Sequence, residues 1–505
     1  MRHNQHLGTI ETMPKDSFEV LSDHKSPPTY NFFDGETWTS SHSGKTVEIV
    51  SPVDGSVVGR IQSVTQSEID SAIARAKDAQ KKWFSIAMTK RGQILHLASD
   101  WIRHHEQMLT AQLITEIGKS VSEAKDEILR SADMIDYFAN AGLSLRGEEL
   151  EGDAFPGYDQ SKMAIVERCP IGVVLAISPF NYPVNLSVSK LAPALIMGNS
   201  VVFKPPTQGS ISCLYLTEIF RVAGVPDGTL VTLTGTGNDI GNYLVTHKDI
   251  NMITYTGSSQ VGKSIATKAG MIPLLFECGG NNPALVLPDA DMVFTAGEIV
   301  KGAFSYSGQR CTAIKYVLGF PPTIDQLIPL VVEKTKSSIK MGDPRIETNN
   351  MGPVISEHAA DEIEKRILVA KAEGATIVFG GKRDGRYIEP TILDNVNPHM
   401  EVMRIETFGP VVSFLRVQAI DEAVKIINDS DYGLQACIFT KDEGAGIVLG
   451  KQLDVGTIQL NNKPQRGPDH FPFLGIKGSG VGVQGISYTL EAMSRPKSIV
   501  LNKPQ

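Results

Sequence analysis

Four apolar runs decide the fold of this 505-residue chain: IGVVLAI (171–177), SVVF (200–203), LVTL (230–233) and INMITY (250–255). Helical stretches and Gly- or Pro-rich turns separate them. Short apolar runs that alternate with helices are typical of βαβ units, whose strands form a parallel sheet covered by helices. This part of the sequence therefore predicts an α/β lobe.

The same alternation continues towards the C-terminus and predicts a second lobe. Residues 357–373 have helical periodicity and are followed by Gly374, a residue that often ends helices. Further short apolar runs lie at 284–287, 375–380, 411–416, 437–439 and 457–460. A cleft between two such lobes is a common place for a ligand.

The N-terminal part contributes a polar tail and then a helix. Residues 1–28 are polar and are expected to be a frayed tail. The stretch from Thr65 to Glu68 has the form of a capping box, which predicts that a helix begins there.

Composition argues against several classes of protein. The formal charge of -8 gives no basis for nucleic-acid binding or for an anionic membrane surface. A 19-residue uncharged window at 171–189 is interrupted by prolines and asparagines, so a strand running into a loop is favoured over a membrane span. The five cysteines are too few for a disulfide framework, which favours the cytoplasm, and their spacing fits no zinc site, so no metal is expected.

One stretch of the sequence matches a known phosphate-binding motif at every fixed position. Residues 257–264 satisfy G-x-x-x-x-G-K-S and follow a predicted strand. One hypothesis is therefore a P-loop NTPase, although no acidic partner for magnesium is evident. The alternative is that a dinucleotide phosphate lies at the N-terminus of the following helix.

Two residues suggest nucleophilic chemistry. Cys311 lies in a polar segment directly after Arg310, and nearby positive charge favours the reactive thiolate. Glu277 ends an apolar run beside a glycine turn, where partial desolvation suits a general base. The plainer interpretations are a structural thiol and a capping or ion-paired glutamate.

Five motifs together resemble the aldehyde dehydrogenase superfamily, in the family's order and from about Tyr30 to the C-terminus. They are Pro179–Pro183, Tyr255–Ser258, Phe276–Gly280, the segment around Cys311, and Glu406–Pro410. Within the superfamily, 203–210, 308–313 and 461–475 are similar to the non-phosphorylating, NADP-dependent glyceraldehyde-3-phosphate dehydrogenases. The family usually has leucine where this chain has Cys278.

The resemblance implies a fold of two parallel-sheet α/β lobes with a small β-ribbon. The cofactor-binding domain would comprise 29–145 and 169–276, and the catalytic domain 277–482. The oligomerisation element would comprise 146–168 and 483–505. The implied assembly is a homotetramer built from dimers.

The resemblance also implies a reaction. Cys311 would attack the aldehyde, the Asn181 amide and the Cys311 backbone N–H would stabilise the oxyanion, and Glu277 would activate the water that hydrolyses the thioester. The implied overall reaction is irreversible oxidation of D-glyceraldehyde 3-phosphate to 3-phosphoglycerate with NADP.

Two sets of binding residues follow from the resemblance. NADP is favoured over NAD, because Thr207 stands where NAD-preferring relatives often carry a glutamate. The implied cofactor-binding residues are Ser178, Lys204, Thr207, Gly257, Ser258 and Glu406. The substrate-binding residues would be Arg130, Tyr182, Arg310 and Arg466, since a guanidinium suits the paired oxygens of a phosphate.

Other interpretations stay open at this point. Each arginine could instead form a surface ion pair. Another anionic aldehyde, such as succinate semialdehyde, would also suit the arginines. A catalytically silent relative is disfavoured because both Cys311 and Glu277 are present.

Overall fold

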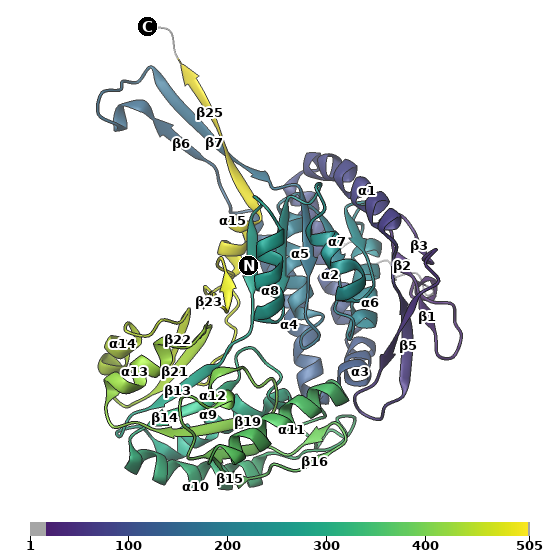
Figure 1. The fold of residues 1–505 in the computed structure, drawn as a ribbon. Coiled ribbons are helices and arrows are strands. Elements are labelled where there is room, and N and C mark those ends of the chain that lie inside the picture. Colours follow the sequence, from purple (N-terminus) through teal and green to yellow (C-terminus); the bar gives the residue numbers. More distant parts are fainter. Residues whose placement is uncertain (1–16, 503–505) are drawn as a thin grey trace, which may run out of the picture.

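The computed structural model describes residues 17–502, which form two α/β lobes and a protruding arm (Figure 1). This confirms the predicted fold class.

The first lobe is built on an eight-stranded sheet within residues 17–502. Its strand order is β24-β12-β11-β8-β9-β10-β2-β3, and the strands from β12 to β10 run parallel. The bounds are β24 Gly480–Val481, β12 Leu274–Glu277, β11 Met252–Thr256, β8 Val173–Ile177, β9 Ser200–Lys204, β10 Leu230–Thr232, β2 Phe32–Phe33 and β3 Trp38–Thr39. The four apolar runs quoted first are β8 to β11, so that prediction is confirmed.

Helices cover this sheet. The predicted capping box is present at the start of α1, with Thr65 as the N-cap and Glu68 in the first turn. Figure 1 shows α4 and α5 side by side beside the sheet. The helices are α1 Gln66–Ser85, α2 Met88–His104, α3 Glu106–Ile117, α4 Val121–Gly142, α5 Asn185–Ile196, α6 Ser210–Val222, α7 Asn242–Val245, α8 Ser259–Lys268 and α15 Ile486–Ala492. A small sheet beside them contains β1 Thr29–Tyr30, β5 Val57–Gln62 and β4 Thr46–Val50.

The second lobe contains a seven-stranded sheet within residues 17–502, in the order β15-β18-β19-β14-β13-β21-β22. All neighbouring pairs except β15 and β18 run parallel. The strands are β15 Thr376–Phe379, β18 Thr391–Asp394, β19 Val411–Arg416, β14 Ile314–Gly319, β13 Asn282–Val286, β21 Gln435–Phe439 and β22 Thr457–Leu460. Every apolar run predicted in this half coincides with or overlaps one of them.

Helices and two short strand pairs complete the second lobe. The predicted helix at 357–373 is α11, and Gly374 after it has φ +108°. The helices are α9 Met292–Phe304, α10 Pro321–Ser338, α11 Glu357–Ala372, α12 Glu401–Arg404, α13 Ile420–Asn428 and α14 Glu443–Gly450. The strand pairs are β16 Arg383–Asp384 with β17 Tyr387–Ile388, and β20 Tyr432–Gly433 with β23 Ile476–Lys477.

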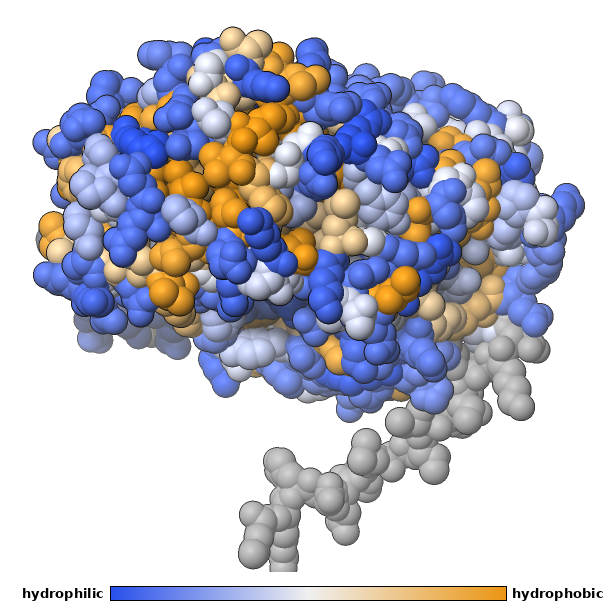
Figure 2. All heavy atoms as spheres, turned by 90° about the horizontal axis from the view of Figure 1, so that it is seen from below, coloured by the Kyte–Doolittle hydropathy of each residue, from blue (hydrophilic) through white to orange (hydrophobic). Residues whose placement is uncertain are grey.

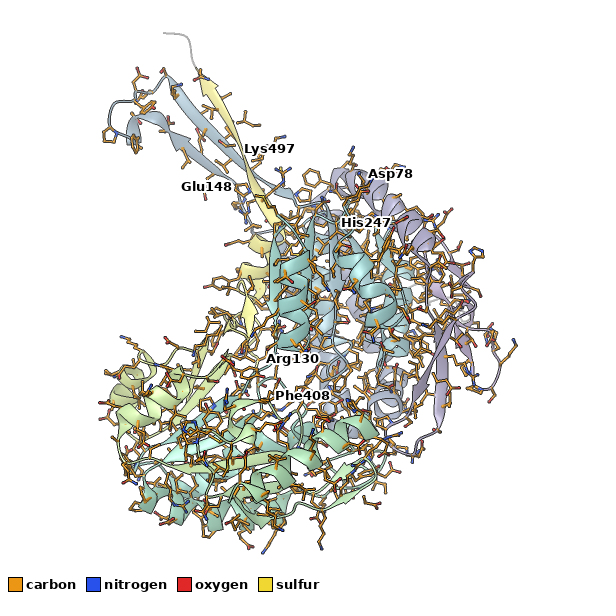
Figure 3. All side chains as sticks on the ribbon, viewed as in Figure 1. Asp78, Arg130, Glu148, His247, Phe408 and Lys497 are labelled. Carbon is orange, nitrogen blue, oxygen red and sulfur yellow. The ribbon has the colours of Figure 1, made fainter. Side chains whose placement is uncertain are left out.

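The arm is an antiparallel sheet in the order β25-β7-β6, which protrudes from the first lobe (Figures 1 and 3). Its strands are β25 Ser494–Asn502, β7 Lys162–Pro170 and β6 Glu148–Glu151. Apolar side chains on it are exposed, among them Leu150, Ile165, Ile499, Val500 and Leu501.

The structure differs from the predicted segment boundaries in three places. Leu21 is 1% exposed and packs with Tyr30, so the chain from residue 17 on is not a frayed tail, while residues 1–16 lie outside the described part. Helix α15 packs against α4 and α5 through Ile486 and Leu490 instead of joining the arm. Strand β24 pairs with β12 and so extends the first-lobe sheet.

The uncharged window at 171–189 contains β8, a loop and the start of α5. In residues 17–502, no helix is both long and apolar enough to cross a membrane. The face seen in Figure 2 is mainly hydrophilic, with apolar atoms gathered in patches.

Candidate active site

Predicted site residues of the first lobe lie at the carboxyl ends of neighbouring parallel strands. Ile177 at the end of β8 is paired with Lys204 and Tyr255, and Thr256 is paired with Glu277. The ends of β8, β9, β11 and β12 are therefore level. Ligands of open α/β sheets bind at this edge.

A cavity of about 540 Å³ opens beside these strand ends and is lined by both lobes. Its volume lies within the roughly 300–1,000 Å³ typical of small-molecule sites. Figure 3 shows the labelled Arg130 and Phe408 where the two lobes meet. Six of the predicted residues line the cavity: Arg130, Tyr182, Glu277, Arg310, Cys311 and Arg466.

Cys311 follows a backbone turn of unusual conformation. The three residues Tyr306, Ser307 and Gly308 have φ values of +48°, +52° and +67°. This region is costly for residues with a side chain, and such conformations persist only where the surroundings enforce them. A Cβ on Gly308 would lie 2.1 Å from the Gly409 carbonyl oxygen, so glycine is required there.

Contacts from several segments hold this turn, which we call the nucleophile loop (residues 305–311). The Glu123 carboxylate accepts from the Tyr306 backbone N–H at 2.7 Å. Lys315 Nζ donates to the Gly308 carbonyl at 2.8 Å, and Ser307 Oγ donates to the Gly352 carbonyl at 2.6 Å. Asn181 Nδ2 donates to the carbonyl of Gln309 at 3.0 Å. The predicted oxyanion donor Asn181 therefore lies beside the nucleophile loop, with a second amide N–H to offer.

The thiol of Cys311 corrects one expectation. Burial raises its pKa to about 12, and the carboxylates of Glu277 and Glu406 add to this, while Arg466 and Arg310 oppose it. The sequence shows the adjacent arginine but neither the burial nor the distant carboxylates. In this structure the thiol is protonated at neutral pH.

Glu277 is buried and ion-paired. One carboxylate oxygen lies 2.5 Å from Arg466 Nη1, and the other accepts from Thr256 Oγ1 at 3.0 Å. Arg466 Nη2 also donates to Gln484 Oε1 at 2.8 Å. The ion-paired interpretation considered above therefore applies to Glu277, inside the cavity rather than on the surface.

Glu406 reaches the site by lying against the turn after Glu277. The Gly280 backbone N–H donates to its carboxylate at 3.1 Å, and a Cβ on Gly279 would lie 2.1 Å from that carboxylate. Burial raises the pKa of Glu406 to about 7, while Lys315 opposes the shift. Gly279 is needed for this close approach.

The predicted cofactor-binding residues lie around the strand ends. Among them, Lys204 has the surroundings that fit an anionic ligand best. Its Nζ is buried, its nearest partner is the carbonyl of Pro205 at 3.1 Å, and burial lowers its pKa to about 8. Among residues 17–502 this buried ammonium has no carboxylate partner, which fits an anionic ligand such as a ribose phosphate. Thr207 is partly exposed nearby, whereas Ser178 is buried and accepts from Ser187 Oγ at 2.9 Å.

The P-loop interpretation of 257–264 is wrong. Only Gly257 and Ser258 lie between β11 and α8, and Ser258 caps the helix by accepting from the Val261 N–H. Gly262 and Lys263 are already inside the helix, and Lys263 is exposed. A P-loop needs a longer loop whose backbone N–H groups surround the phosphates.

Two of the predicted substrate arginines already have carboxylate partners. Arg130 pairs with Asp469 at 2.6 Å and donates to the Arg466 carbonyl at 2.9 Å. Arg466 pairs with Glu277, as described above. The hydrogen bonds of Arg310 within residues 17–502 go to the carbonyl oxygens of Lys301 and Gly302. Next to this group, Lys119 Nζ lies 3.3 Å from the centre of the Tyr182 ring.

One face of α4 brings the surrounding loops together, which the sequence prediction missed. Glu123 holds the nucleophile loop, and Glu127 accepts from the backbone N–H groups of Val184 and Asn185 at 2.9 and 3.1 Å. Arg130 holds the loop that contains Asp469. The spacing i, i+4, i+7 places all three on one side of the helix. That spacing is visible in the sequence, but a polar helix face is more often exposed to solvent.

Comparison with known proteins decides the family. The model of the aldehyde dehydrogenase family matches residues 38–499. The chain belongs to this family. The resemblance read from the five motifs is thereby confirmed.

Individual relatives of this aldehyde dehydrogenase family member give finer similarities. An NADP-dependent glyceraldehyde-3-phosphate dehydrogenase of Streptococcus equinus is 45% identical, over 94% of this chain and 98% of the relative. The crystal structure of such an enzyme from Bacillus halodurans, complexed with NADP, is 46% identical with a TM-score of 0.92, and covers 94% of this chain and 99% of that one. A 3-sulfolactaldehyde dehydrogenase of Priestia aryabhattai is 36% identical, over 94% of this chain and 98% of the relative.

Proposed function

We propose that the chain oxidises D-glyceraldehyde 3-phosphate to 3-phosphoglycerate with NADP, through a cysteine thioester that water hydrolyses. The observation that carries this proposal is the single cavity in which Cys311, Glu277 and a group of cations meet. The similarity to dehydrogenases named for this substrate supports it.

The first step is attack of the Cys311 sulfur on the aldehyde carbon, once the thiol has lost its proton. The Asn181 amide and the Cys311 backbone N–H are placed in this proposal as donors to the resulting oxyanion. Loss of one such donor typically costs about 2.7–4 kcal/mol of transition-state stabilisation. Asn181 is fixed close to this position by its bond to Gln309.

When bound, NADP supplies the hydride acceptor. Lys204, Thr207 and Ser178 are proposed to receive the ribose phosphate, and the N-terminus of α8 at Gly257 and Ser258 to face the pyrophosphate. Glu406 is proposed to accept from the hydroxyls of the nicotinamide ribose. The unpaired ammonium of Lys204 supports this assignment.

Glu277 then acts as the general base for the water that cleaves the thioester. Its carboxylate is buried next to Cys311 in the same cavity. Because Arg466 holds one of its oxygens, the arginine orients Glu277. Arg130, Tyr182, Arg310 and Arg466 are the proposed surroundings of the substrate phosphate.

A cytoplasmic homotetramer is the proposed form of the protein. The exposed apolar residues of β25 and the neighbouring arm strands support pairing of subunits there. All five cysteines are free, as is common in a reducing compartment.

The decisive test is NADPH formation from D-glyceraldehyde 3-phosphate with and without inorganic phosphate. We expect activity in both cases, because water rather than phosphate cleaves the thioester, and loss of activity in Cys311→Ser. A requirement for phosphate, or full activity of the serine variant, would overturn the mechanism.

A substrate panel separates the rival anionic aldehydes. The similarity to a 3-sulfolactaldehyde dehydrogenase makes that sulfonate the second candidate, and succinate semialdehyde is the third. The proposal requires the highest kcat/KM with the phosphorylated aldehyde. A higher value with the sulfonate or the carboxylate would replace the proposed substrate.

A further inference from the structure

Lys119 is a fully buried cation with no role in the reaction proposed above. It follows Gly118, which ends α3 with a φ of +71°, and it precedes α4. Its side chain is 0% exposed and forms an ion pair with Glu127, whose side chain is 0% exposed as well. Glu127 lines the cavity, whereas Lys119 does not. The ammonium therefore lies behind the cavity wall.

The ammonium of Lys119 also lies against two aromatic rings. Its Nζ is 3.3 Å from the centre of the Tyr182 ring and 4.8 Å from that of Tyr306. The two rings meet edge to face, with their centres 6.1 Å apart. A cation this close to an aromatic ring is attracted to it, most strongly where water is excluded. Lys119 thus joins the β8–α5 loop (residues 178–184), which contains Tyr182, to the nucleophile loop, which contains Tyr306.

Glu127 holds the other end of the same β8–α5 loop. Its second carboxylate oxygen accepts from two backbone N–H groups at the start of α5, at 2.9 and 3.1 Å. Asn181 directly precedes Tyr182 and so belongs to the part of the loop that the Lys119 ammonium contacts. The ion pair therefore fixes the segment with the proposed oxyanion donor relative to the segment with the nucleophile.

Stability alone gives a poor account of this ion pair. Burying two charges costs solvation energy, and replacing a buried pair by uncharged side chains of similar volume is often neutral or stabilising. Burial lowers the pKa of Lys119, since desolvation disfavours the ammonium, while Glu127 opposes the shift. Because the pair contacts both loops, their placement explains its presence better.

We propose that Lys119 is a positioning residue. By joining the β8–α5 loop to the nucleophile loop, it places the Asn181 amide where the oxyanion forms when Cys311 attacks. The inference rests on the role of Asn181 in the proposed function and deepens it, because it names the group that keeps this donor in place. Lys119 does not contact the substrate in this account, so it acts equally on every aldehyde.

The test removes both charges with Lys119→Met/Glu127→Gln, because Lys119→Met alone would leave a buried carboxylate unpaired. Methionine packs well against aromatic rings, and the glutamine oxygen can still accept from the start of α5. The single-turnover rate of NADPH formation reports the steps up to hydride transfer. We expect it to fall about tenfold with D-glyceraldehyde 3-phosphate and by the same factor with D-glyceraldehyde, since a misplacement of about 1 Å can cost about 10²-fold.

Coupling to Asn181 separates positioning from a general loss of structure. Asn181→Ala removes the donor itself and should slow the single turnover by about 10²–10³-fold. If Lys119 acts through this amide, the triple variant should be no more than about twofold slower than Asn181→Ala, whereas independent effects would multiply. The rise in Tm caused by NADP should equal that of the wild type. A smaller rise would overturn the inference, because the pair would then support the cofactor site or the fold as a whole.

The matched control is Lys125→Met/Glu106→Gln, which removes a partly exposed lysine–glutamate pair, 3.4 Å apart, between α4 and α3. It should retain the wild-type rate. Multiplied losses in the triple variant, an unchanged rate in the double variant, a loss confined to one aldehyde, or an equal loss in the control would overturn the inference. Failure of the wild type to oxidise D-glyceraldehyde 3-phosphate would instead contradict the proposed function, and the coupling would still be measured with D-glyceraldehyde.

Discussion

The nucleophile loop and the turn that holds Glu277 enter the same cavity but are fixed in different ways. Glu123, Lys315, Asn181 and Gly352 each hold a different point of the loop. Glu277 is held by one hydrogen bond and one ion pair. The comparison teaches that several contacts share the placement of the nucleophile, whereas the base depends on a single charged partner.

The largest effect should come from Glu277→Gln, which removes the base but leaves the loop intact. We expect a burst of NADPH with a steady-state rate lower by about 10²–10⁴-fold, the range of general acid–base contributions. Stopped-flow absorbance measures both phases. If the burst is lost as well, Glu277 acts before the thioester forms. The roles of Glu277 and Cys311 would then not be separable in the way proposed here.

Arg466→Leu should show how far the base depends on its partner. With its orienting charge gone, Glu277 is misplaced, and a misplacement of about 1 Å can cost about 10²-fold in rate. Turnover should therefore fall with D-glyceraldehyde as well as with the phosphorylated substrate. A loss confined to the phosphorylated substrate would show that Arg466 binds the anion without orienting the base.

The pH dependence of Cys311 alkylation tests the loop without catalysis. Since the folded pKa is raised to about 12, the thiolate fraction is small at neutral pH and increases with pH. Iodoacetamide labelling of the cofactor-free protein should accelerate about a hundredfold between pH 7 and pH 9, following a tenfold rise in thiolate for each pH unit. Cys311→Ser corrects for labelling elsewhere, and a rate that levels off below pH 9 would contradict the burial argument.

The smallest effect should come from Ser307→Ala. One hydrogen bond to Gly352 is lost, at a cost of about 0.5–1.5 kcal/mol in unfolding free energy. Because other contacts still hold the loop, the alkylation rate of Cys311 should change less than about threefold. Denaturant unfolding and labelling measure the two quantities. A large drop in labelling at unchanged stability would mean that the loop depends on this one contact.

Much of the fold was predictable because it follows local patterns. The run 411–416 coincides with β19, since the inner strands of a parallel sheet are buried and are mainly apolar. The capping box at Thr65 needed only nearby residues. Leu21 was misjudged because Phe18, Val20 and Leu21 are too few to give a periodic signal.

The electrostatics of the site were not predictable in the same way. Glu277 and Arg466 are 189 positions apart, so no local pattern announces their ion pair. Glu277 and Glu406, which add to the raised pKa of Cys311, are likewise distant from it in the sequence.

Helix α4 ties the two lobes together, which restricts how the cavity can exchange its contents. Glu123 and Arg130 extend from a first-lobe helix to Tyr306 and Asp469. A hinge motion that parted the lobes at this helix would break both contacts at once and expose a buried carboxylate. We therefore expect substrate to enter and product to leave through the mouth of the cavity. The two lobes can then stay in contact throughout a catalytic cycle.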